Sequence, residues 1–312
     1  MSTTAVPRVH ILLSTYNGER FIDSQLDSLF AQTYPNIVIH VRDDGSADAT
    51  VDLINARLNK GIPIIFDRGR NIGVIASFME LLASVDKEGE LYAFCDQDDV
   101  WRPDKISRAV ERIMQSSAPD KMLYCSRLEY VDERLNHLGY SLVPRVTGFR
   151  NAIVENIATG CTVVFGSSIR KQILAGNPAD MIMHDWWAYL VASAFGEVAY
   201  DNFPSIQYRQ HRDTVTAWEP GLVKIRARAR GLAKRLKMLE HTGLESLNQA
   251  IRFLEVYPDA PVEMKRIVTR LVALRERGRF WQRMRYILHP EVLRTNPVEN
   301  WSLKPMILFG WH

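Results

Sequence analysis

Residues 9–50 read VHILLSTYNGERFIDSQLDSLFAQTYPNIVIHVRDDGSADAT, and this stretch decides the class of fold. Two short apolar runs, Val9–Leu13 and Ile37–Val41, flank the segment Asn17–Gln32, whose apolar residues recur at helical spacing. A strand, a helix and a second strand in this order are typical of a βαβ unit with parallel strands. The sequence therefore predicts an α/β fold at its amino-terminal end.

The same alternation continues to about residue 217. Further strands are predicted at 63–66, 91–95, 122–126, 162–165, 198–200 and 205–208. Further helices are predicted at 47–58, 74–84 and 185–195, with another that starts near residue 101. We therefore expect a Rossmann-like, mostly parallel sheet flanked by helices, which forms one domain over residues 1–217.

Residues 218–312 differ from this domain in charge and pattern. They carry 18 Lys and Arg residues against 9 Asp and Glu residues, whereas residues 1–217 carry 21 against 27. Helical spacing relates Leu222, Ile225, Ala229, Leu232, Leu236 and Leu239, with basic residues between them. A basic amphipathic helix is typical of anionic membrane surfaces. The alternatives are a solvated face packed on the first domain and contacts in a homo-oligomer. No base-reading motif is present, so we expect no nucleic-acid partner.

The composition is that of a globular protein, with 46% hydrophobic and 24% charged residues. The three cysteines, Cys95, Cys125 and Cys161, form no CxxC pair. This disfavours a disulfide framework or a zinc site and fits a reducing cytoplasm. No apolar run reaches 18 residues, and the start of the chain has no apolar segment of signal-peptide length. We therefore expect a cytoplasmic protein, peripheral on the inner face of the plasma membrane if its basic helices bind lipid.

Polar clusters follow three of the predicted strands. Ser14–Asn17 follows the first strand, Asp43–Ser46 the second and Asp96–Asp99 the fourth. An open parallel sheet binds its ligands at the carboxyl ends of its strands. The three clusters are therefore expected to converge on one binding site.

The cluster Asp96-Gln97-Asp98-Asp99 places three carboxylates within four residues. Carboxylates this close repel one another unless a cation neutralises them. Oxygen ligands at a strand end suit Mg²⁺ or Mn²⁺, which also bind substrate phosphates. The alternative is a solvated acidic turn that caps the following helix. The apolar strand before the cluster favours the metal site.

The other two clusters allow two interpretations each. Asp43-Asp44-Gly45-Ser46 is either a turn with Ser46 as helix N-cap, or a site where a carboxylate accepts from the N3–H of uracil or thymine. The cluster Ser14–Asn17 is either a strand-to-helix turn, or a loop in which Tyr16 stacks on a base. The residues alone leave both questions open.

Taken together, these motifs resemble those of a known protein family. The stretch 11–50, with NIGVIASF at 71–78 and FCDQDDVWRPDKI at 94–106, resembles the family 2 inverting glycosyltransferases of the GT-A fold. The resemblance covers about residues 8–215. The segments TGCTVVF at 159–165, MHDWW at 183–187 and QYRQHRDTV at 207–215 resemble the bacterial rhamnosyltransferase-type branch, which builds cell-surface polysaccharides.

The resemblance implies roles for the residues of the donor site. Ser14, Tyr16 and Asp44 are expected to contact the nucleoside, and Glu19 is expected to reach the ribose. Asp98 matches the main metal ligand, and Asp96 lies where the family approaches the ribose and the waters of the metal. The cofactor implied is Mn²⁺ or Mg²⁺.

Asp185 falls where the family places its catalytic base. Taken alone, it is also compatible with a charge that stabilises a helix start. Its neighbours His184, Trp186 and Trp187 favour a partly desolvated carboxylate of higher basicity. We expect His184 to be structural, and the two tryptophans belong to the core more often than to a sugar platform.

Arg209 and His211 follow the last predicted strand. A guanidinium there can clamp a diphosphate, and a neutral imidazole can join the ligands of the metal. We therefore add Arg209 to the donor site and His211 to the metal site.

The expected function is inverting, metal-dependent transfer of a sugar, with rhamnose from dTDP-rhamnose as the first candidate. The donor is a dTDP- or UDP-linked sugar, and the acceptor is a saccharide or a polyprenyl-linked saccharide. The alternatives are a UDP-sugar transferase of the same family and a non-catalytic GT-A scaffold. A nucleotidyltransferase is disfavoured, because Ser14–Asn17 is not the Gly-rich, Arg-containing loop such enzymes carry.

Overall fold

The computed structural model describes residues 6–60, 63–85, 87–212, 232–276, 278–296, 300, 304, 307 and 308, without the side chains of 232–243. The chain forms two units. The first contains Met1–Ser141 and Ala158–Val215, and the second contains Leu142–Ile157 and Thr216–His312. The second unit thus includes a segment, 142–157, that the sequence analysis places inside the first domain.

Within the described residues, the first unit is built on one sheet in the order β3-β2-β1-β4-β8-β6-β9-β5, with β7 paired to β6. The strands are β1 Val9–Thr15, β2 Ile37–Asp43, β3 Ile64–Arg68, β4 Leu91–Cys95, β5 Val100–Trp101, β6 Met122–Val131, β7 His137–Tyr140, β8 Val164–Gly166 and β9 Glu197–Arg209. Strands β1 to β4 pair in parallel, as predicted. Strands β5, β7 and β8 pair antiparallel to their neighbours, so the sheet as a whole is mixed.

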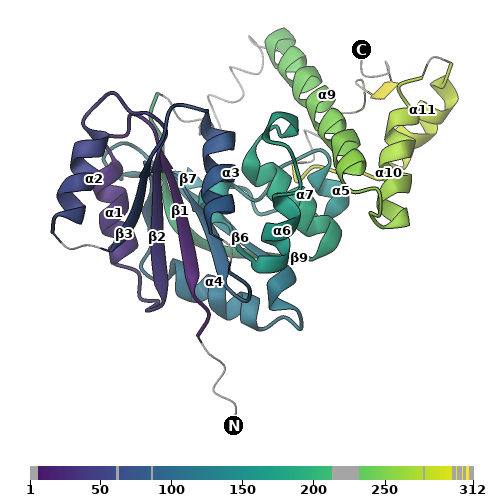
Figure 1. Ribbon diagram of the computed structural model, residues 1–312. Helices are drawn as coiled ribbons and strands as arrows, with labels where there is room; N and C mark the ends of the chain where they lie inside the picture. Colours follow the sequence, from purple (N-terminus) through teal and green to yellow (C-terminus); the bar gives the residue numbers. More distant parts are fainter. Residues whose placement is uncertain are drawn as a thin grey trace. The chain divides into compact units, whose positions relative to one another are not determined.

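Helices cover both faces of this sheet (Figure 1). They are α1 Ile22–Phe30, α2 Thr50–Leu58, α3 Val74–Ser84, α4 Lys105–Met114, α6 Ser167–Ile173 and α7 His184–Phe195. Alternate side chains of a strand point to opposite faces. Val9, Ile11 and Leu13 accordingly pack in one core with apolar residues of α1, α2 and α4. On the other face, Phe94 of β4 lies 5.3 Å from the ring of Phe78 in α3.

Two predicted helix starts are wrong. The first helix begins at Ile22 and not at Asn17, because residues 17–21 form a turn in which the Gly18 N–H donates to Thr50 Oγ1 at 2.8 Å. The second helix begins at Thr50, so Ser46 does not cap it. Ser46 instead donates its backbone N–H to the side chain of Asp43 at 2.9 Å.

The strand β9 is also longer than predicted. The sequence indicates two short strands at 198–200 and 205–208, whereas the structure has one strand over Glu197–Arg209. Pro204 interrupts the pattern, but the pairing of β9 with β6 shifts its register next to Arg127, which lies opposite Pro204. A bulge at this point allows the strand to continue past a residue that lacks an N–H.

The described part of the second unit is helical. Its helices are α5 Phe149–Ala152, α9 Leu232–Val256, α10 Val262–Ala273 and α11 Phe280–Leu288. The segment 142–157 is bonded to the chain near residue 294. Asn151 donates to the Leu293 carbonyl at 3.0 Å, and Arg294 donates to the Val154 carbonyl at 3.0 Å.

Part of the predicted basic helix lies outside the described residues, including Leu222, Ile225 and Ala229. The predicted boundary at 217–221 lies there too. The backbone from Leu232 onward is helical, as part of α9. Among the described residues, no helix is long and apolar enough to cross a membrane.

Candidate active site

The ends of β1 and β4 are joined by the side chain of Gln97. Its amide oxygen accepts from the Thr15 hydroxyl at 2.6 Å and from the Tyr16 N–H at 2.9 Å, and its amide nitrogen donates to the Tyr16 carbonyl at 3.1 Å. Gly18 leaves room for this contact, because a Cβ there would lie 2.2 Å from Gln97 Oε1. The amide therefore holds the Ser14–Asn17 cluster against the acidic cluster.

The ends of β1 and β2 are joined as well. The Asp44 N–H donates to the Thr15 carbonyl at 2.7 Å, and the Asn17 N–H donates to Ser46 Oγ at 2.9 Å. The Asn17 side chain accepts from the Ala47 N–H at 2.9 Å. Asn17 has a φ of 48°, in the left-handed region that asparagine adopts more readily than most residues. The three predicted clusters therefore do meet at one edge of the sheet.

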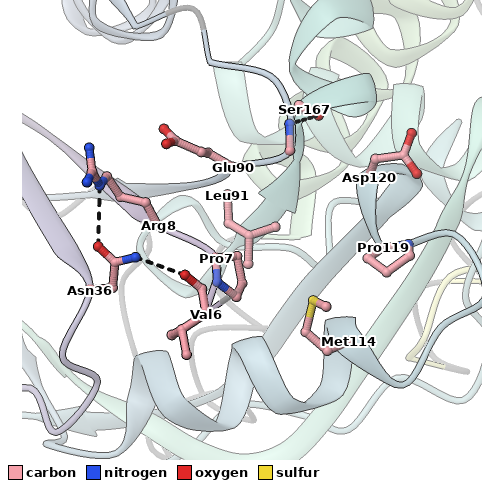
Figure 2. Close-up of a pocket in the computed structure, with 11 residues that line it drawn as sticks. Val6, Pro7, Arg8, Asn36, Glu90, Leu91, Met114, Pro119, Asp120 and Ser167 are labelled. Carbon is pink, nitrogen blue, oxygen red and sulfur yellow. Dashed lines mark hydrogen bonds between the residues drawn. The ribbon is translucent and has the colours of Figure 1, made fainter. Parts of the chain in front are cut away.

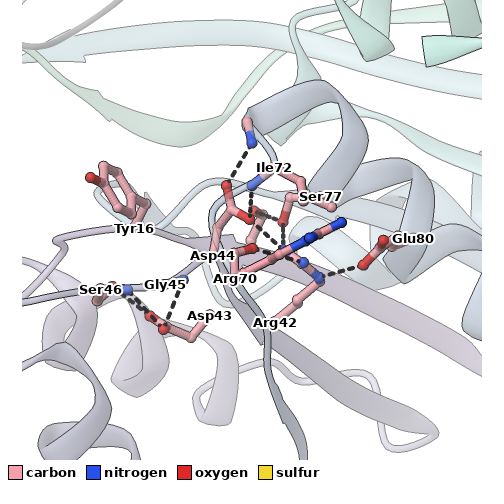
Figure 3. A network of polar contacts seen from close by, with 12 residues as sticks. Tyr16, Arg42, Asp43, Asp44, Gly45, Ser46, Arg70, Ile72, Ser77 and Glu80 are labelled. Carbon is pink, nitrogen blue, oxygen red and sulfur yellow. Dashed lines mark hydrogen bonds and ion pairs between the residues drawn. The ribbon is translucent and has the colours of Figure 1, made fainter.

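Asp44 is a buried carboxylate at this edge (Figure 3). Its Oδ1 accepts from Arg42 Nη1 at 2.6 Å and from the Ile72 N–H at 2.9 Å. Its Oδ2 accepts from the Gly73 N–H at 2.9 Å. One of the two interpretations of this cluster was a turn. That turn is stabilised by Asp43, whose side chain accepts from the N–H groups of Gly45 and Ser46.

The other residues predicted to contact the nucleoside lie at the β1 side of the edge. The Ser14 hydroxyl lies 2.6 Å from Ser77 Oγ of α3. The side chain of Tyr16 is free to stack, since the residue is 47% exposed. The Glu19 carboxylate accepts from the Ala49 N–H at 2.9 Å, so it holds the start of α2. Their contacts with a nucleoside stay predictions.

The acidic loop after β4 meets the end of β9. Asp98 Oδ2 lies 2.6 Å from His211 Nε2, so two of the three predicted metal ligands are in direct contact. Desolvation, together with the charges of Asp98 and Asp185, raises the pKa of Asp96 well above its usual value. Carboxylates that raise one another's pKa in this way are stabilised by a bound cation.

Asp99 and Arg209 support this loop from its buried side. Asp99 Oδ1 accepts from the Arg209 N–H at 3.1 Å. The Arg209 guanidinium donates to the carbonyls of Asp98, at 2.8 Å, and of Glu133, at 2.6 Å. Arg209 is only 4% exposed. In this structure it fixes the loop that carries Asp98, and its predicted contact with a diphosphate stays a prediction.

Asp185 lies in the first turn of α7, close to the acidic loop. Its Oδ2 accepts from the Gly160 N–H at 2.8 Å, and its Oδ1 accepts from the Trp186 N–H at 2.6 Å. The residue is 7% exposed, so it is not an ordinary surface charge at a helix start. Trp186 and Trp187 are buried, as expected of core residues.

The donor atoms present fit a hard divalent cation. Asp96, Asp99 and Cys161 each place a ligand atom within 4.8 Å of the other two. Burial raises the pKa of the Cys161 thiol, which therefore stays protonated and is a poor ligand for Mg²⁺ or Mn²⁺. Carboxylate oxygens and an imidazole are suitable, and Asp98 and His211 supply them.

Gly160 and Cys161 are site residues that were not predicted. Both lie in the motif TGCTVVF, whose resemblance to the rhamnosyltransferase-type branch was the signal in the sequence that could have indicated them. In the structure the motif joins two parts of the site. Gly160 holds Asp185, and the Cys161 thiol interacts with Asp96 and Asp99.

A pocket of about 430 Å³ lies at the opposite edge of the sheet (Figure 2). It is lined by Pro7 and Arg8 before β1, by Leu91 at the start of β4, and by Met114 and Pro119. Parallel sheets bind ligands at the carboxyl ends of their strands, and this pocket lies at the amino ends. It is therefore separate from the site around Asp98.

Comparison with known families decides the class of protein. Glycosyl transferase family 2 matches residues 10–176, which is more than half of the chain. The chain belongs to this family. Its members transfer sugars, so the chain is a glycosyltransferase, and the family resemblance noted in the sequence is confirmed.

Relatives and solved structures agree with this family 2 assignment. The dTDP-rhamnosyl transferase RfbG of Shigella flexneri is 31% identical over 218 residues, which are 64% of this chain and 72% of RfbG. An uncharacterised glycosyltransferase of Rickettsia typhi is 27% identical, over 67% of this chain and 65% of the relative.

The fold of this family 2 chain is also found in solved glycosyltransferases. TarS 1-349 of S. aureus in complex with UDP-GlcNAc has a TM-score of 0.54 at 16% identity, covering 96% of this chain and 90% of that one. The mannosyltransferase PcManGT of Pyrobaculum calidifontis, in complex with GDP-Man and Mn²⁺, has a TM-score of 0.50 at 15% identity, covering 99% and 86%. The predicted GT-A fold is confirmed.

Proposed function

We propose that this glycosyltransferase moves a sugar, with inversion and with the help of a divalent cation, from a nucleotide diphosphate to a saccharide or lipid-linked saccharide. The observation that carries the proposal is the position of Asp96 between two groups: its carboxyl interacts with Asp98, which contacts His211, and with the buried carboxylate of Asp185. A rhamnosyl transferase among the relatives supports dTDP-rhamnose as the first candidate donor.

On the donor side, the strand-end edge holds the nucleotide. Tyr16 presents an exposed ring for stacking on the base, and Asp44 presents a carboxylate fixed by its own donors. Asp98 and His211 would hold the cation, with Asp96 interacting with Asp98. Bound there, Mn²⁺ or Mg²⁺ supplies positive charge against the leaving diphosphate.

On the acceptor side, Asp185 takes the proton from the attacking hydroxyl. The N–H groups of Gly160 and Trp186 fix the orientation of its carboxylate. An acceptor oxygen that attacks the anomeric carbon opposite the diphosphate inverts the configuration there. This geometry needs the base and the diphosphate on opposite sides of the sugar ring.

The base assignment is tested with Asp185→Asn, a change of similar shape that removes the basic oxygen. Transfer is expected to fall by at least about 10³-fold, since general base catalysis is worth about 10² to 10⁴-fold. Nucleotide affinity is expected to stay within about threefold of the wild type. Retained turnover would remove Asp185 as the base.

The metal assignment is tested with Asp98→Ala. Nucleotide binding by the wild type is expected to strengthen when Mn²⁺ is added, and binding by the variant is expected to be insensitive to Mn²⁺. Equal affinities of the two proteins with and without Mn²⁺ would argue against a metal at Asp98.

The donor itself is identified by screening nucleotide sugars with Mn²⁺ for thermal stabilisation and for slow hydrolysis. Stabilisation by dTDP-rhamnose above that by UDP-sugars is the expected result. A preference for a UDP-sugar would keep the enzyme class and replace the sugar. A chain that binds no nucleotide sugar would be a non-catalytic scaffold.

A further inference from the structure

Arg42 is a buried cation in contact with Asp44, the residue predicted to bind the nucleobase, and it has had no role assigned so far. It lies near the end of β2, opposite Ser14 of β1, and is 3% exposed. A guanidinium is costly to bury unless its N–H groups are bonded. In this protein each of its three nitrogens donates to an acceptor, and the acceptors come from different elements (Figure 3).

These acceptors make Arg42 a junction of the surrounding loops. Nη1 donates to Asp44 Oδ1 at 2.6 Å and to Ser77 Oγ at 3.0 Å. Nε donates to Glu80 Oε2 at 2.9 Å, and Nη2 donates to the Arg70 carbonyl at 3.3 Å. A single side chain thus sets the positions of the Asp44 carboxylate, the helix α3 and the loop after β3.

The protein leaves space for this guanidinium at Gly69. A Cβ at position 69 would lie 2.4 Å from Arg42 Nη2 and 2.8 Å from its Cζ. Gly69 also donates its N–H to the Asp43 carbonyl at 2.9 Å. The loop therefore packs its backbone directly against Arg42, which a side chain at position 69 would prevent.

The donors around Asp44 determine what it can still bind. A carboxylate has about four acceptor positions. Among the described residues, Oδ1 accepts from Arg42 and the Ile72 N–H, while Oδ2 accepts only from the Gly73 N–H. Oδ2 therefore keeps one acceptor position. All three groups that point at the Asp44 carboxylate are donors, so both of its oxygens act as acceptors in a fixed orientation.

We propose that Arg42 is a positioning residue that determines which base the donor site takes, by fixing Asp44 as an acceptor only. Uracil and thymine present an N3–H donor to such a carboxylate, whereas cytosine presents a bare nitrogen that it repels. The inference rests on the proposed function, because it requires that the strand-end edge binds a nucleotide.

An arginine is needed here because its planar fork reaches several acceptors at fixed angles, which a lysine cannot do. In Arg42→Gln the cation and most of its N–H donors are lost, so the Asp44 carboxylate loses its hydrogen bond from Nη1 and is free to rotate. In Arg42→Lys the charge stays but the fork is lost. The two variants separate the effect of charge from the effect of geometry.

The test measures competition by UDP, TDP and CDP, each with Mn²⁺, on the wild type, on both Arg42 variants and on Arg57→Gln. Arg57 is a matched control, since it also pairs with two carboxylates, Asp23 and Asp27, but on α1 and α2. Thermal unfolding is recorded for all four proteins, so that a loss of stability is separated from a loss of base preference.

Arg42→Gln is expected to weaken UDP and TDP by about tenfold or more, the effect of losing a charge-assisted hydrogen bond, and to leave CDP unchanged. The preference for UDP over CDP then falls by the same factor. The UDP-to-CDP affinity ratio of Arg42→Lys is expected to lie between those of the wild type and Arg42→Gln, and Arg57→Gln is expected to keep the wild-type ratio. With the identified donor, KM is expected to rise more than kcat falls.

An unchanged UDP-to-CDP ratio in Arg42→Gln would overturn the inference while leaving the proposed function intact. The ratio stays the same if no affinity changes, and also if all three affinities fall equally, as a purely structural role predicts. A wild-type protein that binds none of the three nucleotides would instead contradict the proposed function, and the inference with it.

Discussion

His184 is a polar side chain that the fold keeps neutral beside the proposed base. It is 2% exposed, stacks on Phe78 at 4.0 Å and meets the edge of Phe94 at 4.8 Å. Neither ring nitrogen has a hydrogen-bond partner in the described part of the chain. Burial lowers the pKa of His184 to about 3. The expectation of a structural histidine therefore agrees with its surroundings.

This burial predicts a pH dependence of stability. An unfolded histidine takes up a proton near pH 6.5, whereas the folded His184 stays neutral down to about pH 3. The unfolded state thus binds more protons in this window, so the free energy of unfolding falls as the pH is lowered from 6.5. Denaturant unfolding of His184→Phe at pH 7.5, 5.5 and 4.5 is expected to give a shallower decline than the wild type.

A decline remains in that variant, because His40 has a pKa lowered to about 4 by burial and by His10. The comparison of the two proteins cancels the contribution of His40 and of the acidic cluster. Parallel declines in the wild type and His184→Phe would show that His184 does not contribute.

Gly160 positions the carboxylate of the proposed catalytic base, Asp185. Its N–H donates to Asp185, and a Cβ there would lie 3.1 Å from His184 Nε2 and 3.5 Å from Asp185 Oδ2. Gly160→Ala is expected to displace the base by a few tenths of an ångström and to lower kcat by about tenfold or more, with the donor KM nearly unchanged. Steady-state kinetics checks this, and an unchanged kcat would contradict it.

At the scale of elements, the clamp between the β1 and β4 loops depends on Gln97. Its three hydrogen bonds to Thr15 and Tyr16 are lost in Gln97→Ala. Because each of the three hydrogen bonds contributes about 0.5–1.5 kcal/mol, the free energy of unfolding is expected to fall by about 1.5–4.5 kcal/mol. The donor KM is expected to rise, since Tyr16 is no longer held against the acidic loop.

The matched control for this change is Gln115→Ala. Gln115 accepts one exposed hydrogen bond from Arg112 at the end of α4, where Met114 lines the pocket at the amino ends of the strands. Chemical denaturation and donor kinetics are measured on both variants. If Gln97→Ala and Gln115→Ala have the same free energy of unfolding and the same donor KM, the hydrogen bonds of Gln97 contribute neither to stability nor to donor binding.

Elements with strong local patterns were predicted well. The strand Leu91–Cys95 has the expected bounds because it is a continuous apolar run, and the helix Val74–Ser84 lies where its mostly apolar sequence indicates it. The strand β7 was missed, since its four residues, His137–Tyr140, are all exposed or half-buried and form no apolar run. It exists through its pairing with β6, which no local pattern indicates.

In the candidate site, too, the features that depend on contacts distant in the sequence were not predicted. Asp98 and Asp185 stand in motifs and were predicted, whereas the N–H of Gly160 that holds Asp185 depends on a contact 25 residues apart. Arg42 was not predicted to have a role, because its partners come from α3 and from the loop after β3. Supporting contacts are a property of the folded chain, so a motif does not reveal them.

At the scale of the whole molecule, the second unit offers a surface that suits the proposed lipid-linked acceptor. On α11, Trp281 is 80% exposed, Leu288 is 70% exposed and Phe280 is 50% exposed. The helix contains no carboxylate and carries Arg285 on its exposed side. Exposed aromatic and aliphatic side chains with free cationic groups are typical of helices at an anionic lipid surface.

The double change Trp281→Ser and Leu288→Ser is therefore expected to weaken sedimentation with phosphatidylglycerol-containing vesicles by about tenfold, because two apolar side chains no longer enter the lipid. Val262→Ser is the matched control, since Val262 is 81% exposed at the start of α10. Equal vesicle binding by the two variants would exclude α11 as the contact.

The division into two units depends on contacts between residues that are far apart in the sequence. The segment Leu142–Ile157 belongs to the second unit through contacts such as that of Arg294 with Val154, which are 140 residues apart. Nothing in the local pattern of residues 142–157 distinguishes it from the surrounding first unit.

That long-range pairing has a consequence for the protein while it is being synthesised. Phe149, Ile153 and Val154 are buried in the finished unit, but Arg294, which donates to the Val154 carbonyl, leaves the ribosome 140 residues after Val154. At about 5–20 residues per second the delay is roughly 7 to 28 seconds. During this interval the growing chain carries an uncovered apolar segment, at which a chaperone is expected to bind.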